Sequence, residues 1–144
     1  MISRLKSWFQ WHGQDKIAKT ISKIFWPPTA AATITTKNNK ILAIKTSNYY
    51  MLPGGITKPG ETFKQTAKRE TKEETNIDVK IQEKIEEKAR PGIGVEIIFR
   101  AKPQNNKLEK SIEGKPVWLT FEEAKKADWR HNRKIHKYLP KNQK

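Results

Sequence analysis

Two runs rich in β-branched and apolar side chains, residues 29–36 and 41–46, stand close together in the sequence. The four residues between them, 37–40, are Lys-Asn-Asn-Lys. Paired asparagines tolerate the positive φ that a tight hairpin turn demands. The pattern therefore predicts a β-hairpin.

Later apolar runs predict a mixed sheet with helices, since strand patterns and helical patterns follow one another along the chain. Strands are expected at residues 79–88, 93–101 and 117–121. A short helix should cover residues 121–126 and a terminal helix residues 132–139, with Pro140 beyond it. Residues 103–115 are polar and predict a surface connection. The fold class is therefore α/β.

The first 26 residues carry apolar side chains at helical spacing, at Ile2, Leu5 and Phe9 and again at Ile17, Ile21 and Ile24. Pro27 and Pro28 end this pattern. Three of the five tryptophans and five basic residues lie in this segment. It predicts amphipathic helices that lie on an anionic membrane surface, pack on the domain or form a homodimer contact. The chain thus divides into a helical extension (1–28), one folded domain (29–140) and a basic tail (141–144).

The composition limits the chemistry that the protein can perform. No cysteine is present, which excludes disulfides, thiolate metal sites and a cysteine nucleophile. The formal net charge is +15, and 24 of the 30 basic residues are lysine. This excess favours polyanionic partners, or it reflects a lysine-rich composition alone. No apolar run approaches the ~20 residues of a membrane-spanning helix, so we expect a cytoplasmic protein.

A helix should begin at Thr62, because Thr62 and Gln65 form a capping box. With about 100° per residue, Glu70 and Glu74 lie on the same side as Phe63 and Ala67, which we expect to face the protein. The lysines of this helix lie on the opposite side. An ordinary helix of lysine–glutamate pairs would not separate its charges in this way.

Glu70, Glu73 and Glu74 therefore form an inward acidic stripe that needs a positive partner. A divalent cation such as Mg²⁺ prefers carboxylate and carbonyl oxygens and meets its substrate through phosphate groups. Gly54 and Gly55 lie just before the helix, where the absence of a side chain allows close backbone approach to an ion or a phosphate.

These residues resemble the signature of the Nudix hydrolase superfamily, G-x5-E-x7-R-E-U-x-E-E-x-G-U, where U is a bulky apolar residue. The matching positions are Gly55, Glu61, Arg69, Glu70, Glu73, Glu74 and Ile77. Two positions depart from the signature. Thr71 replaces an apolar residue, and Asn76 replaces the glycine at the helix end, where asparagine is the next-best left-handed cap. Neither change removes a ligand.

The resemblance implies an α/β/α sandwich around a mixed sheet. It also implies Mg²⁺- or Mn²⁺-dependent hydrolysis of the pyrophosphate bond of a nucleoside diphosphate linked to another group, for example ADP-ribose. On this basis the metal ligands are Gly54 (through its carbonyl), Glu70, Glu73 and Glu74. Arg69 orients Glu73, which binds a second ion or helps to deprotonate the water, and Glu61 braces the loop with Gly55. Which glutamate is the general base stays open.

Other candidates come from outside the signature. Glu96 alternates with apolar residues on a predicted strand, so it either faces solvent or supplies a further carboxylate, as do Glu86 and Glu87. Tyr50 precedes the glycine turn and either stacks on a base or belongs to the core. Arg90 begins Arg-Pro-Gly, which is similar to a proline region of ADP-ribose hydrolases.

There are two alternatives to a small-nucleotide pyrophosphohydrolase, and the first follows from the charge. The segment from Lys125 to the end carries eight basic residues against Asp128, with Trp129 and Tyr138 between them. It could hold an RNA backbone, which indicates an enzyme acting on an RNA cap or 5′ phosphate, or it is a solvated helix face. A non-catalytic adaptor that binds a nucleotide or membrane is the other alternative, and the intact glutamates argue against it.

Overall fold

A computed structural model describes residues 29–90 and 94–141. The predicted helices, membrane contact and dimer contact of residues 1–28 lie outside this range, as does Pro91. Of the basic tail, Lys141 alone is described. Among the described helices, none has the length and hydropathy that a membrane span requires.

Seven strands form one mixed sheet in the order β3-β2-β1-β6-β5, with β4 paired to β1 and β7 paired to β2. The strands are β1 (Thr29–Lys37), β2 (Lys40–Lys45), β3 (Tyr50–Met51), β4 (Gly54–Ile56), β5 (Val79–Arg90), β6 (Gly94–Pro103) and β7 (Lys115–Thr120). β1 runs parallel to β6 and antiparallel to β2 and β4. The hairpin prediction is confirmed, with Asn38 and Asn39 at φ of 50° and 58°.

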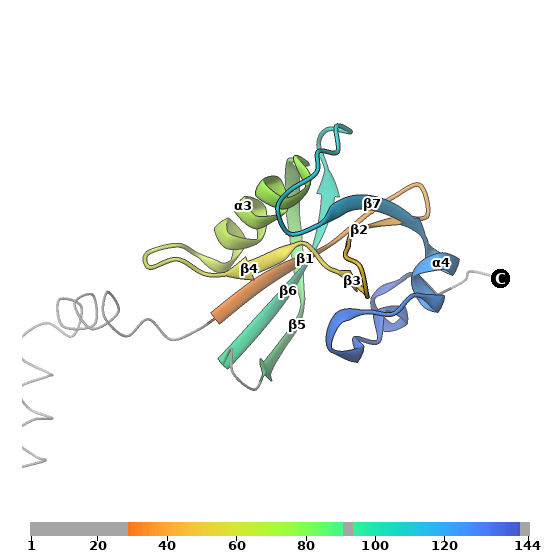
Figure 1. The fold of residues 1–144 in the computed structure, drawn as a ribbon. Coiled ribbons are helices and arrows are strands. Elements are labelled where there is room, and N and C mark those ends of the chain that lie inside the picture. The colour runs from red at the N-terminus through yellow and green to blue at the C-terminus, as the bar shows by residue number, and fades with distance from the viewer. Residues whose placement is uncertain (1–28, 91–93, 142–144) are drawn as a thin grey trace, which may run out of the picture.

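Helix α3 (Phe63–Thr75) carries the acidic residues and packs on one face of the sheet, against β1, β5 and β6 (Figure 1). Its predicted capping box is present, because Thr62 Oγ1 accepts from the Gln65 amide and the Gln65 side chain accepts from the Thr62 amide. Asn76 ends the helix in the left-handed conformation, at φ of 62°. Both ends of α3 therefore follow from the sequence.

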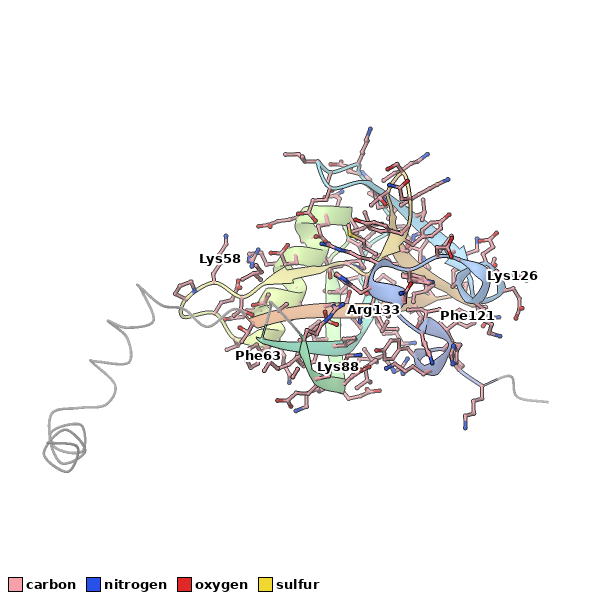
Figure 2. All side chains as sticks on the ribbon, turned by 60° about the horizontal axis from the view of Figure 1, so that its bottom comes forward. Lys58, Phe63, Lys88, Phe121, Lys126 and Arg133 are labelled. Atoms are coloured by element: carbon pink, nitrogen blue, oxygen red, sulfur yellow. The ribbon has the colours of Figure 1, made fainter. Side chains whose placement is uncertain are left out.

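The expectation that Phe63 faces the protein is wrong, since this residue is 39% exposed. In Figure 2 Phe63 lies on the side of the domain away from Phe121. It is the first residue of the helix. The buried face of α3 consists instead of Thr66, Ala67, Thr71, Glu74 and Thr75.

The predicted terminal helix at 132–139 is also wrong. Helix α4 (Phe121–Lys126) forms as expected, but the chain then makes two 3₁₀ turns, η1 (Arg130–Asn132) and η2 (Ile135–Tyr138). His131 and Asn132 adopt positive φ of 60° and 51°, which no α-helix tolerates. The apolar residues of this segment are buried in the core, so packing rather than helical periodicity sets the backbone.

Alternation along β1 assigns its side chains to the two faces of the sheet. Ala31 packs with Ala67 of α3, whereas Ala32 and Ile34 pack with the C-terminal turns. The Thr33 hydroxyl meets the Thr71 hydroxyl of α3 at 3.0 Å. The departure of Thr71 from the apolar signature is thus matched by a polar partner on the sheet.

Candidate active site

A cavity of about 440 Å³ opens over one end of β1, between α3 and the C-terminal turns. Its floor is the alanine run of β1, and β4 forms part of its side. The charged residues that line it are Glu70, Glu74, Arg90, Glu96, Glu113, Arg130 and Arg133. The carboxylates from α3 form an acidic wall, and the arginines form a basic wall.

The acidic wall is centred on Glu74, which is only 4% exposed. The Gly54 amide donates a 2.9 Å hydrogen bond to Glu74 Oε2. Burial, followed by the neighbouring Glu113 carboxyl group, raises the pKa of Glu74 to about 10. A buried carboxylate beside a second carboxylate is stable only when a proton or a cation compensates its charge.

Gly55 brings the backbone directly against Glu70. A Cβ atom placed on Gly55 would lie 2.5 Å from Glu70 Cδ, too close for any real contact. Glu70 also accepts a 2.6 Å hydrogen bond from Arg69 Nη1. The glycine is therefore required here for the space that the carboxylate occupies.

Arg69 is bound mainly by Glu61, with distances of 2.7 Å from Nε and 3.0 Å from Nη2. The Arg69 guanidinium, through its hydrogen bonds to Glu61, lowers the pKa of that carboxyl group to about 2. Glu61 also accepts from the Thr66 hydroxyl and the Lys58 amide. Its contacts thus tie the 57–62 loop to the helix.

Glu73 lies away from the cavity. Its side chain is 55% exposed and accepts a 3.2 Å hydrogen bond from Arg69 Nη1, longer than the bonds from Arg69 to Glu61 and Glu70. The expected pairing of Arg69 with Glu73 is present, but Glu61 holds the guanidinium more extensively. Of the three glutamates in the stripe, only Glu70 and Glu74 line the cavity.

The oxygen atoms of the acidic wall suit a divalent cation. Within residues 29–90 and 94–141 no three acidic or histidine side chains converge on one point, and Arg69 holds Glu70. The oxygen donors nevertheless fit a divalent cation, because the Glu74 and Glu113 carboxyl groups lie side by side at the cavity, next to Glu70. Oxygen ligands of this kind suit a hard divalent cation.

The backbone of Gly54 adds an oxygen to this set. Thr33 N donates to Pro53 O and Thr57 N donates to Thr29 O, so these pairs form the hydrogen-bonded rungs between β1 and β4. Gly54 falls between rungs, and its amide and carbonyl point away from β1. Since the amide meets Glu74, the carbonyl lies on the same side.

Glu96 does not face solvent, although one of its two sequence interpretations expected this. Glu96 is 6% exposed, and β1–β6 pairing sets it opposite Ala30. One of its oxygens pairs with Arg90 and the other lies 2.7 Å from Arg133 Nη2. Both arginines neutralise it, so Glu96 belongs to the basic wall rather than to the acidic one.

The remaining sequence candidates lie in different places. Tyr50 lines the cavity and also packs on Trp129, with ring centroids 6.0 Å apart. Glu86 pairs with Lys137 and the Tyr138 hydroxyl, and Glu87 pairs with Lys84. Neither of these two glutamates lines the cavity.

Sequence reasoning missed Glu113, Arg130 and Arg133. Glu113 stands in a connection that the sequence marks only as polar, and pairing of β7 with β2 carries it to the cavity. The two arginines belong to the basic C-terminal segment, whose sequence shows how many charges it carries but not where they lie in the fold. The only signal for them is that excess charge.

The family model of the NUDIX domain matches residues 26–139. The chain belongs to the Nudix hydrolase family. None of the curated proteins compared with the sequence matches it. The identification confirms the resemblance, the α/β class and the enzyme class predicted from the signature.

Solved Nudix structures are similar to this chain over most of its length. A Nudix hydrolase from Nitrosomonas europaea is 27% identical, with a TM-score of 0.70, covering 78% of this chain and 69% of its own. An Ap4A hydrolase from C. elegans is 27% identical, with a TM-score of 0.58, covering 67% of this chain and 83% of its own. An ADP-ribose pyrophosphatase from Streptococcus suis is 16% identical, with a TM-score of 0.63, covering 77% of this chain and 85% of its own. This last likeness shows the fold alone.

As a Nudix hydrolase, the protein is a pyrophosphohydrolase that acts on small nucleotide-derived substrates. Nudix hydrolases generally depend on divalent metal ions. The oxygen atoms of the acidic wall are of the kind that such ions bind.

Proposed function

We propose that this Nudix hydrolase cleaves the pyrophosphate bond of a nucleoside diphosphate linked to another group, and that Mg²⁺ or Mn²⁺ is held by Glu70, Glu74, Glu113 and the Gly54 carbonyl. The observation that carries the proposal is the buried Glu74 carboxyl group, placed against Glu113 at the cavity. A buried carboxylate beside a second carboxylate is costly unless a cation joins the two.

The residues of the chain have separate tasks in this proposal. When bound, a divalent ion neutralises diphosphate oxygens and lowers the pKa of a water molecule. Arg69 and Glu61 hold α3 and the preceding loop in register. Glu113 lies at the exposed rim, where its carboxylate completes the oxygen ligands of the ion. Glu73 acts on the site through Arg69.

A substrate screen tests the proposal. Purified protein is assayed against ADP-ribose, dinucleoside polyphosphates, NADH, nucleoside triphosphates and capped RNA, with Mg²⁺, with Mn²⁺ and with a chelator. Metal-dependent release of a nucleoside monophosphate supports the proposal. Hydrolysis that survives chelation, or that is equally fast in the Glu70→Gln and Glu74→Gln variants, contradicts it.

A second candidate function is the hydrolysis of an RNA cap or 5′ triphosphate. It is favoured by the position of Arg130 and Arg133 at the cavity and of Lys134 and Lys137 beside an adjoining pocket of about 190 Å³. Such a row of cations can follow an RNA backbone. If the protein cleaves free nucleotides and added RNA does not inhibit that cleavage, the result would argue against this function.

Membrane attachment and homodimer formation stay predictions, because they rest on residues 1–26. Liposome co-sedimentation and the mass in solution, measured with and without those residues, test both. Equal behaviour of the two proteins would remove both predictions. Cytoplasmic location stays a prediction as well.

A further inference from the structure

The basic wall of the cavity carries more positive charge than its one carboxylate needs. Glu96 is paired with Arg90 through one oxygen and with Arg133 through the other. One guanidinium would be enough to neutralise it. The second therefore remains as excess charge, in a part of the cavity where Arg133 and Arg90 are only 15% and 14% exposed. Figure 2 shows Arg133 directed from the C-terminal turns toward the sheet.

Arg130 adds a further guanidinium to the same wall. Its side-chain contact within the part of the chain that the structure describes is with Met51 Sδ, 3.4 Å from Nη1. No carboxylate of that part lies within ion-pairing distance of it, although Asp128 stands two residues away in the sequence. Arg130 thus lines the cavity without an anionic partner of its own.

The lowered pKa of His131 is a further sign of the excess positive charge. His131 lines the cavity between the arginines. Loss of surrounding water, followed by the charges of Arg90, Arg130 and Arg133, lowers its pKa below the ordinary value. The surrounding arginines thus disfavour a further positive charge on the ring.

The cationic surface continues behind the wall. The adjoining pocket shares Arg90, Glu96, His131 and Arg133 with the cavity and adds the basic residues Lys88, Lys134 and Lys137. Glu86, which pairs with Lys137 at 3.0 Å, offsets part of this charge. The wall has three guanidinium groups and the single Glu96 carboxylate, so the remaining mutual repulsion of the guanidiniums falls only when a further anion joins them.

We propose that Arg90, Arg130 and Arg133 form a subsite for a phosphate group beyond the diphosphate that is cleaved, so that the preferred substrates are nucleotides with three or more phosphates in a row. The proposal rests on the proposed function, which places the cleaved diphosphate at Glu70 and Glu74. Arginine matches phosphate because its fixed N–H groups can contact two oxygens at once. Glu96 is a positioning residue that holds two of the three guanidiniums.

The cavity also has room for this arrangement. Its volume of about 440 Å³ lies within the ~300–1,000 Å³ that small-molecule sites occupy. Its acidic and basic walls come from opposite sides, α3 with the 111–114 turn on one and β5, β6 and the C-terminal turns on the other. A neutral sugar at the far end would leave Arg130 without an anion and the excess charge of the wall unbalanced.

Three compounds with the same adenosine test the proposal. ATP and diadenosine tetraphosphate carry a phosphate beyond the cleaved bond, and ADP-ribose carries a neutral sugar there. The parent protein should have the higher kcat/KM for one or both polyphosphates. The Arg130→Gln variant should lower the ratio of polyphosphate to ADP-ribose kcat/KM about tenfold or more, because a charged hydrogen bond is worth about 1.5–3 kcal/mol.

A matched control is Arg100→Gln. Arg100 pairs with Glu83 at 3.0 Å and lines neither pocket. This variant should leave the substrate ratio as it is in the parent protein. Arg130 makes no ion pair among the described residues, so its replacement should keep the thermal midpoint, and a fold measurement accompanies each variant.

Binding without turnover provides an independent readout. Inorganic tripolyphosphate and pyrophosphate are titrated calorimetrically into Glu70→Gln protein and into the Glu70→Gln, Arg130→Gln double variant. Tripolyphosphate should bind more tightly than pyrophosphate to the first protein, and the difference should shrink in the second. If the double variant lost affinity equally for tripolyphosphate and pyrophosphate, the proposed subsite would be wrong.

The outcomes separate the two proposals. Metal-dependent hydrolysis of ADP-ribose in preference to ATP and diadenosine tetraphosphate overturns the subsite and leaves the proposed function standing. Hydrolysis of triphosphorylated RNA without hydrolysis of either free polyphosphate overturns the subsite as stated. If none of the compounds is cleaved, the proposed function fails, and the binding titration still decides whether the arginines hold a third phosphate.

Discussion

The Gly54 amide donates a 2.9 Å hydrogen bond to Glu74 Oε2, which ties the strand before the acidic helix to the buried end of that helix. A side chain at Gly54 would collide with Ala31, whose carbonyl oxygen lies 2.5 Å from the position of a Cβ atom. The sheet, the glycine turn and the carboxylate are therefore fixed relative to one another. Preorganisation of this kind is what a metal-dependent site needs.

Replacing Gly55 by alanine should displace Glu70, because the new Cβ atom would lie 2.5 Å from Glu70 Cδ. A shift of about 1 Å in a catalytic group can cost about 100-fold in rate. We expect kcat/KM to fall by about tenfold or more while the protein stays folded. The assay is steady-state hydrolysis together with the thermal midpoint. Unchanged activity in a folded variant would show that the position of Glu70 is not critical.

Replacing Glu61 by glutamine should destabilise the protein in a pH-dependent way. The pKa of Glu61 is lowered from 4.5 to about 2 in the folded state, chiefly through Arg69. A carboxyl group with a lowered pKa in the folded state contributes its full stabilisation above its unfolded pKa. That stabilisation is lost as the pH falls through the folded pKa. The parent should therefore exceed the variant by about 1–3 kcal/mol at pH 7, and this advantage should shrink between pH 4.5 and 2.

Urea unfolding across that pH range measures the effect of Glu61. Glu83→Gln is the control, because the Glu83 side chain is 62% exposed where it pairs with Arg100. Exposed pairs contribute little. A constant difference between parent and Glu61→Gln at all pH values would contradict the ion-pair explanation.

Replacing Thr71 by valine should cost about 1–3 kcal/mol of unfolding free energy. The Thr71 hydroxyl donates to the Ala67 carbonyl at 2.7 Å, so the Thr33 hydroxyl must be the donor in the 3.0 Å contact between the two threonines. Valine at position 71 leaves that buried donor without an acceptor. Combined with Thr33→Val, the loss should be smaller than the sum of the single losses. Additive losses in chemical denaturation would show that the two hydroxyls are not coupled.

The sequence predicted the parts of the site that local spacing determines. Glu70 and Glu74 lie one helical turn apart, and the capping box fixes where that helix starts, so their shared face follows from periodicity. Glu73 shows the limit of this reasoning. Its position on the helix was clear, but the distance of that face from the cavity depends on how α3 packs on the sheet.

The basic wall could not be predicted, because long-range contacts assemble it. Glu96 alternates with apolar residues on both sides, and only the placement of β6 beside β1 shows that both faces of the strand are buried from Glu96 to Phe99. Arg130 and Arg133 flank residues with positive φ, where helical periodicity fails. Glu113 reaches Glu74 through the pairing of β7 with β2.

The most direct test of the account is a calorimetric titration of Mn²⁺ into the parent protein and into the Glu70→Gln and Glu74→Gln variants, followed by hydrolysis assays of the same samples. Glu122→Gln is the control, since that side chain is 68% exposed on α4 and lies off the cavity. We expect Mn²⁺ binding and hydrolysis in the parent and the control. In the two variants, binding should weaken and kcat/KM should fall by about 100-fold. Unchanged Mn²⁺ affinity and turnover in both variants would contradict a metal site at these glutamates.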